Sequence, residues 1–176
     1  MKAKIFLILG LVVLVLIGTI SSCCSNRNRT SEEKYDILDM LECKSVGDLK
    51  LVIYYKSPFT LTRYPWDTST LIKNCDYKIE VDGEKLKKYA DIFNQINNDV
   101  LVTVNKPSYK DIRICYTIEN IYSGKNVIIA LWGSNGDSIF FNGVEVEAND
   151  IFYDVIMPFL EDNSVNELKE WLRGKR

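Results

Sequence analysis

A nearly unbroken run of apolar residues close to the start of the chain constrains its fold more than any other feature. Residues 5–20 are apolar apart from two glycines and one threonine, and Lys2 and Lys4 precede them. A short basic region, an apolar stretch and then small residues are typical of an export signal. The run has 16 residues, fewer than the ~20 that a membrane-spanning helix needs. We therefore expect the folded part of the protein to be built from the residues that follow.

The end of this segment carries a short motif. Ile20-Ser21-Ser22-Cys23 places an aliphatic residue and two small residues before a cysteine, and this arrangement resembles the lipobox of bacterial lipoprotein precursors. The resemblance covers only the first 23 residues. It implies that residues 1–22 are a signal peptide that is removed, and that Cys23 receives a diacylglyceryl thioether, often with an acylated amino end. The implied location is the extracytoplasmic side of the cell membrane. Two or three acyl chains give a lasting anchor, because each buried CH2 contributes about 0.8 kcal/mol.

Two other interpretations of this segment stay open. Arg27 and Arg29 nearly balance Lys2 and Lys4, so the charge asymmetry that orients a membrane segment is weak, and an uncleaved signal anchor is an alternative. A cysteine beside a membrane segment can also be palmitoylated reversibly or left unmodified. Simple secretory cleavage is less favoured, because the sequence offers no site of the A-x-A kind.

The residues after the signal are enough for one domain. We interpret residues 23–31 as a polar, lipidated tether and residues 32–176 as a single domain. Removal of two lysines and no acid with the signal would take the formal net charge from −2 to −4. A mildly acidic domain without a basic cluster does not suit nucleic acid, whose phosphates require a positive surface. The expected partners are the membrane, through the anchor, and an envelope protein or a small ligand.

Catalytic and cofactor chemistry finds little support in the sequence. The chain has no histidine, which removes the commonest general base and metal ligand. P-loop, GxGxxG, GxSxG and DxDxDG motifs are also missing, so we expect no cofactor, no metal site and no catalytic residue. Glu145 and Glu147 share one side of a short strand, but solvated surface charge is favoured over a glycosidase pair. Cys43, Cys75 and Cys115 lack zinc spacing, and free thiols are favoured over one disulfide.

The hydrophobic pattern predicts mainly strands. The predicted strands cover residues 49–56, 71–81, 100–104, 111–119, 126–132, 138–141 and 144–147. Asn142-Gly143 joins the last two as a strong hairpin signal. Helices are predicted from Thr30 to about Cys43, over residues 84–97, after Asn149, and from a capping box at Ser164 and Glu167. Tight hairpins require antiparallel pairing. We therefore predict an α+β fold, with a single antiparallel sheet of about six to seven strands and helices packed mainly on one face.

The long connection over residues 57–70 is the first candidate binding site. Arg63, Tyr64 and Trp66 lie there between Pro58 and Pro65. Aromatic faces stack on planar or sugar-like ligands, and an arginine supplies directional hydrogen bonds. The alternative, which is favoured, is that the rings fold over a sheet edge as a small additional core.

The less regular face of the sheet is a second candidate. Val52, Tyr54, Ala130, Trp132 and Phe140 occupy alternate positions of their strands. If helices cover only one face, these residues form an apolar patch of the kind that binds partners. The slightly favoured alternative is that the terminal helices cover them.

The resemblance implies a membrane-anchored extracytoplasmic lipoprotein, and the remaining patterns favour a domain that binds a ligand or another protein. An envelope hydrolase that uses Asp and Glu carboxylates, or an unrecognised serine–lysine site, is the alternative from a different class. A structural or assembly partner of another envelope protein is the third.

Overall fold

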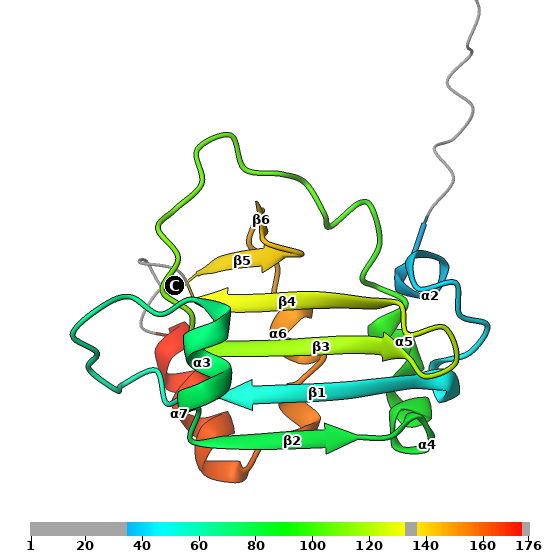
Figure 1. Ribbon diagram of the computed structural model, residues 1–176, viewed down its shortest axis with the longest axis horizontal. Coiled ribbons are helices and arrows are strands. Elements are labelled where there is room, and N and C mark those ends of the chain that lie inside the picture. Colours follow the sequence, from blue (N-terminus) through cyan, green and yellow to red (C-terminus); the bar gives the residue numbers. More distant parts are fainter. Residues whose placement is uncertain (1–34, 133–136, 174–176) are drawn as a thin grey trace, which may run out of the picture. The chain divides into compact units, whose positions relative to one another are not determined.

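Six antiparallel strands form one open sheet in the part of the chain that the structure describes. This computed structural model describes residues 35–132 and 137–173. The strand order is β2-β1-β3-β4-β5-β6, as Figure 1 shows. The strands are β1 (Leu49–Tyr55), β2 (Tyr77–Val81), β3 (Ile114–Asn120), β4 (Asn126–Trp132), β5 (Ser138–Phe141) and β6 (Val144–Val146). The predicted α+β fold with a single antiparallel sheet is confirmed.

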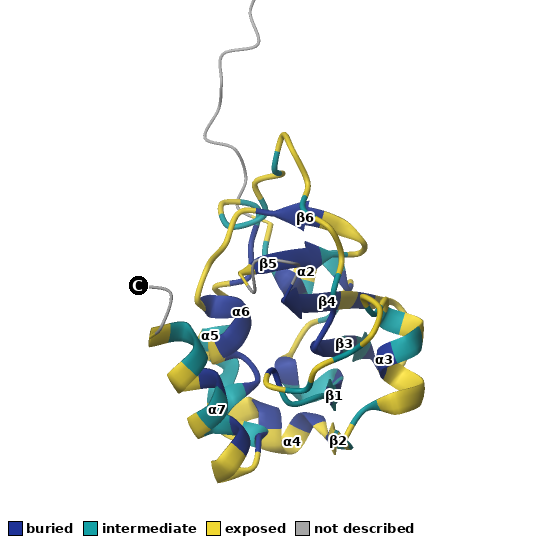
Figure 2. Cartoon of the chain, turned by 90° about the vertical axis from the view of Figure 1, so that its left-hand side faces the viewer, coloured by how far each residue is buried: buried dark blue, intermediate teal, exposed yellow. Residues whose placement is uncertain are grey.

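Short helices and turns connect the strands and lie mainly on one face. The α-helices are α2 (Ile37–Met40), α3 (Thr68–Asn74), α4 (Gly83–Leu86), α5 (Ala90–Phe93), α6 (Ile151–Asp154) and α7 (Asp162–Arg173). Three 3-10 turns accompany them, η2 (Val46–Asp48), η3 (Lys87–Tyr89) and η4 (Met157–Phe159). Figure 2 shows α4, α5, α6 and α7 on one side of the sheet and α3 on the other. None of the helices in residues 35–132 and 137–173 is long and apolar enough to cross a bilayer.

The main core lies between the sheet and the larger group of helices. Every second residue of the strands points into it, because successive side chains of a strand alternate between its faces. The Tyr116 hydroxyl reaches across this core and donates a hydrogen bond of 2.8 Å to the Phe152 carbonyl. Burial raises the pKa of Tyr116 well above its usual value. The core includes Leu51, Ile53, Tyr116, Ile118, Ile129 and Leu131 from the strands and Phe93, Phe152, Ile156 and Leu168 from the helical layer.

The second half of the sheet agrees best with the sequence pattern. β4 is central, as its apolar residues on both faces predict, and pairs with β3 and β5. The β5–β6 hairpin turns at Asn142 and Gly143, which have φ of 48° and 83°, a conformation that these two residue types tolerate. The predicted strand over residues 100–104 is reduced to a single bridge between Thr103 and Val146. Its neighbour β6 has only three residues, so longer pairing is not available to it.

The predicted strand over residues 71–81 is wrong in its first half. Residues Thr68–Asn74 form α3, and the strand begins only at Tyr77. Asp67 explains the difference, because its carboxylate accepts a hydrogen bond of 2.7 Å from the Thr70 N–H. An aspartate that caps a helix in this way stabilises its first turn.

Three helix predictions need correction at their boundaries. The helix predicted over residues 84–97 is broken into α4, η3 and α5, with Tyr89 at φ −119° and ψ 17° between the last two. The first helix begins at Ile37 behind a capping box of Asp36 and Asp39, while the box predicted at Thr30 lies outside the described residues. The last helix begins at Asp162, two residues before the predicted cap.

The second face of the sheet carries a smaller core. The prediction that the terminal helices cover this face is wrong, because α3 lies there instead. Leu71 of α3 packs there with four buried residues of the sheet side, and Trp66 and Tyr54 lie against them. Trp132 does not share this face. Its φ of 120° departs from the strand conformation, and its side chain joins the main core. The four buried residues are Ile112, Cys115, Ala130 and Phe140.

The described cysteines are free thiols. Cys43 and Cys75 are half-buried and Cys115 is buried. Burial raises the pKa of Cys115 to about 12. The lipidation candidate Cys23, the signal peptide and the tether lie outside the described residues.

Candidate functional site

The predicted binding segment is an irregular loop that joins β1 to α3. Its first residues are fixed to the segment before β3, because the Lys56 N–H donates a hydrogen bond of 2.8 Å to the Arg113 carbonyl. Its last residues are fixed to the same segment, since the Ile112 N–H donates a hydrogen bond of 2.8 Å to the Trp66 carbonyl. We call residues 57–66 the binding loop. Figure 1 shows it beside α3, at the end of β1.

A buried ion pair holds the middle of the binding loop. Arg113 is only 5% exposed, and its guanidinium donates two hydrogen bonds to the Asp111 carboxylate, of 2.5 Å and 3.0 Å. Arg113 Nη2 also donates to the Thr62 hydroxyl at 2.9 Å. Asp111 Oδ1 in turn accepts a hydrogen bond of 3.0 Å from the Trp66 N–H. The two charged residues therefore join both halves of the loop to the sheet, and we call them the buried brace.

Trp66 belongs to the supported part of the loop. Its ring is half-buried and packs against the smaller core. Two cations lie against the ring, with Lys56 Nζ at 5.7 Å and Arg113 Cζ at 5.9 Å from its centre. Of the three predicted binding residues, Trp66 is thus the one that the structure places over the sheet face.

The tip of the binding loop exposes apolar side chains. Leu61 is 98% exposed, Tyr64 is 66% exposed and Phe59 is 51% exposed. Arg63 is exposed beside them, with its guanidinium 5.4 Å from the centre of the Tyr64 ring. Residues 57–66 contain no acid, so the tip combines apolar side chains with a positive charge.

A groove of about 470 Å3 runs along the loop, lined by residues 58–65 together with Asp111, Arg113 and Trp171. Trp171 comes from α7 and connects the loop to the main core. Its ring lies 4.1 Å from that of Trp132 and 6.3 Å from the ring of Phe59, which meets it edge to face. Aromatic pairs of this kind add stability beyond the area that they bury. The groove therefore has a fixed aromatic wall at one end and the buried brace below the loop.

Sequence reasoning missed both residues of the brace. In the sequence pattern, Arg113 falls on the same side of its strand as Cys115. Nothing in the pattern of residues 57–66 indicates a contact with it. The Thr62 side chain is 51 residues away along the chain from its partner Arg113. The only local signal is an aspartate two residues before an arginine. This spacing does not indicate that the two residues contact residues 57–66.

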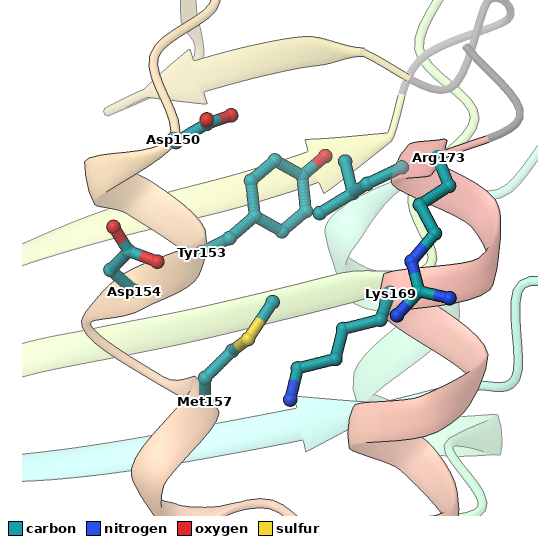
Figure 3. A pocket seen from close by; sticks show the side chains of 7 residues that line it. Asp150, Tyr153, Asp154, Met157, Lys169 and Arg173 are labelled. Carbon is teal, nitrogen blue, oxygen red and sulfur yellow. The ribbon is translucent and has the colours of Figure 1, made fainter. Parts of the chain in front are cut away.

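A second hollow of about 290 Å3 lies between α6 and α7. Figure 3 shows Asp150 just before α6, Asp154 on α6, Lys169 and Arg173 on α7, and Tyr153 between the two helices. Tyr153 is 3% exposed, and its hydroxyl has no hydrogen-bond partner in the described structure. Burial and the carboxylates of Asp137 and Asp150 raise its pKa above the usual value. Acidic side chains line one side of the hollow and basic side chains the other, and they come from two separate segments, so no single motif predicts it.

The carboxylates considered for catalysis do not form a solvated pair. Glu145 is 8% exposed, and its carboxylate accepts a hydrogen bond from the Ser108 N–H. The expectation that it is surface charge is therefore wrong, because residue 108 folds over it. Glu147 is exposed and follows the end of β6. Within residues 35–132 and 137–173, no group of three or more Cys, Asp or Glu side chains is placed to hold a metal ion.

Comparison with known proteins adds no relative. Scans against protein-family models, curated proteins and solved structures found no match for this chain.

Proposed function

We propose that this protein is a lipid-anchored lipoprotein on the extracytoplasmic side of a bacterial cell membrane, and that its domain binds an envelope protein through the binding loop. The export signal and Cys23 support the location. The observation that supports the binding role is Leu61, which is 98% exposed on a loop that a buried ion pair holds in place.

A braced loop with an apolar tip suits a binding surface. Ordering a flexible segment on binding costs free energy, and a loop that is already fixed avoids most of this cost. Tyrosine and arginine are enriched among the residues that dominate protein–protein affinity, and Tyr64 and Arg63 lie together at the tip. The tip protrudes, so the partner best suited to it has an apolar pocket with an acidic rim.

The loop is also well separated from the start of the described chain. The chain enters at Tyr35 beside α2, which is held at the other end of the sheet by a hydrogen bond of 3.1 Å from Asn120 Nδ2 to the Leu41 carbonyl. Figure 1 shows α2 and the binding loop at opposite ends of β1. β1 has seven residues, so the two ends are roughly 23 Å apart at about 3.3 Å per residue. An anchor attached before Tyr35 would therefore join the domain far from the binding loop.

Lipidation is tested with Cys23→Ala. Cells grown with labelled palmitate should label the wild-type protein and leave the variant as an unlabelled, unprocessed precursor. A double variant that also replaces Cys24 controls for modification at the neighbouring thiol. Label that persists in the double variant, or a mature chain that begins elsewhere than Cys23, would refute the lipoprotein assignment and favour the signal anchor.

Binding through the loop is tested with a photo-crosslinking amino acid in place of Leu61. The matched control carries the same group at Tyr122, which is 80% exposed in the β3–β4 connection at the far end of the sheet. We expect a discrete protein adduct from position 61 that is absent from position 122 and is lost when Arg63→Glu is added. Equal amounts of adduct from both positions, or an amount that Arg63→Glu does not change, would contradict binding at the loop.

A further inference from the structure

β2 is an edge strand whose outer side is open in the described part of the chain. It pairs with β1 in the antiparallel register that places Ile79 opposite Ile53. It stands first in the strand order, and Figure 1 shows it at the edge of the sheet, beside β1. Unpaired backbone groups of an edge strand are a template for another strand.

The register shows which backbone groups point outward. Lys56 donates its N–H to the carbonyl of Arg113, the residue opposite it when the β1–β3 register is extended by one position. In an antiparallel pair such hydrogen-bonded positions alternate along the strand. Even-numbered residues of β1 therefore bond to β3 and odd-numbered ones to β2. On β2 the odd-numbered residues bond inward, so the N–H and C=O groups of Lys78 and Glu80 face away from the sheet.

The side chains of these two residues carry opposite charges on the same face. Lys78 Nζ lies 2.5 Å from Glu80, and Lys50 Nζ of β1 lies 2.7 Å from the same carboxylate. Both charged side chains of β2 are about half exposed, at 44% for Lys78 and 47% for Glu80. Ile79 lies between them and points to the helical face, where it is half-buried.

The charges of β2 are complementary to those of a second β2 when the two strands run antiparallel about Ile79. Lys78 of one copy then lies opposite Glu80 of the other, and their outward N–H and C=O groups form the hydrogen-bonded pairs of the ladder. Opposite charges directly across an antiparallel pair are favourable, and like charges are unfavourable. Centring the pair on Lys78 or on Glu80 instead would set two like charges against each other. Among these three centres, the one on Ile79 is therefore favoured.

We infer that β2 pairs with β2 of a second copy of this chain, centred on Ile79, and joins the two sheets of six strands into one of twelve. A strand of five residues buries less than the about 800 Å2 per partner of a standard stable interface. The pair is accordingly weak in dilute solution. Confinement of both copies to one membrane by the proposed lipid anchor, a step that rests on the proposed function, would raise their effective concentration and favour the pair.

Disulfide trapping with Ile79→Cys tests the pairing in the full chain. Residues across the two-fold axis form a non-hydrogen-bonded pair, with Cα atoms ~4.5 Å apart, which lies within the usual 4.4–6.8 Å of a disulfide. Membranes from expressing cells are treated with a mild oxidant and separated on non-reducing gels. We expect a disulfide-linked dimer from Ile79→Cys at several times the amount seen with the wild type or with the exposed control Lys88→Cys. No excess over the wild type, or equal dimer from Lys88→Cys, would overturn the inference.

A charge exchange between copies tests the register. In the Ile79→Cys background, Lys78→Glu alone sets Glu opposite Glu, and Glu80→Lys alone sets Lys opposite Lys, so each should lose most of the dimer. Co-expression of the two variants with different tags restores opposite charges between copies, and the mixed dimer should return. This recovery cannot come from contacts within one chain. Equal dimer in every combination, or no recovery on mixing, would refute the pairing, and neither result depends on the binding loop or on its partner.

Discussion

Removal of the Asp111 carboxylate is the most direct test of the buried brace. Asp111→Ala would leave the Arg113 guanidinium, which is 5% exposed, without its counter-charge. Loss of one partner of a buried ion pair costs about 3–5 kcal/mol, because the remaining charge is uncompensated. The Asp111 side chain is 23% exposed, so water can reach the site, and the lower end of about 3 kcal/mol applies. At roughly 2–4 °C per kcal/mol for a domain of this size, Tm should fall by about 10 °C.

The assay is urea unfolding combined with limited proteolysis. Trypsin cleaves after arginine, and Arg63 lies in the loop that the brace holds, so Asp111→Ala should also speed cleavage at Arg63. Glu42→Ala is the matched control, because its ion pair with Lys125 is about half exposed or more on both sides. Loss of such a surface pair changes stability by only about 0–1 kcal/mol.

A double variant separates the ion pair from simple packing. Asp111→Leu with Arg113→Met replaces both charges by apolar groups of similar volume, a change that is often neutral in buried pairs. We expect it to recover most of the stability lost in Asp111→Ala while loop cleavage at Arg63 stays fast, because the Trp66 N–H still lacks its acceptor and the Thr62 hydroxyl has also lost its donor. A free energy of unfolding of Asp111→Ala within about 1 kcal/mol of the wild-type value, which is the range of surface pairs, would refute the brace. So would a double variant that is as unstable as the single one.

Three further predictions concern other parts of the domain. Gly83→Ala should destabilise the domain by about 2 kcal/mol or more in urea unfolding, because its Cβ would lie 1.9 Å from the Gly47 carbonyl oxygen; wild-type stability would contradict this contact. Cys115 should resist alkylation at pH 8 until the protein unfolds, since burial raises the pKa of its thiol to about 12, and rapid labelling of the folded protein would refute this. Hydrogen bonds from Lys50 and Lys78 lower the pKa of Glu80 to about 2. These contacts should be complete above its ordinary pKa of 4.5 and disappear as pH falls through about 2, which carboxyl NMR shifts would show, whereas a midpoint near 4.5 would exclude the lysine contacts.

Local signals predicted the parts of the fold that local chemistry decides. The Asn142-Gly143 turn fixes the β5–β6 hairpin through two residues with positive φ, and the apolar pattern of β4 predicts its place inside the sheet, between β3 and β5. The wrong prediction for α3 comes from two competing local signals. The alternation before Tyr77 favours a strand, whereas the Asp67 cap favours a helix over the same residues, and the packing of Leu71 adds to the effect of the cap.

The candidate site was less accessible to sequence reasoning, because its support comes from far along the chain. Residues 63, 64 and 66 could be named from their types, yet their different environments could not. Trp66 is drawn onto the sheet by Arg113 and the smaller core, while Tyr64 stays 66% exposed. Periodicity reports which face of an element is buried, and an irregular loop has no periodicity to read.

The proposed anchorage and the proposed pairing together restrict how two copies would lie on a membrane. Antiparallel pairing of two β2 strands reverses strand direction, so the two copies of α2 would lie at opposite ends of the joined sheet. Under the proposed anchorage, strands that run parallel to the membrane surface would bring the starts of both described domains equally close to it. Each binding loop would then face sideways along the membrane. We therefore expect the adducts formed at position 61 to contain membrane-bound proteins, and adducts with freely soluble proteins alone would show that pairing and loop binding do not occur in the same assembly.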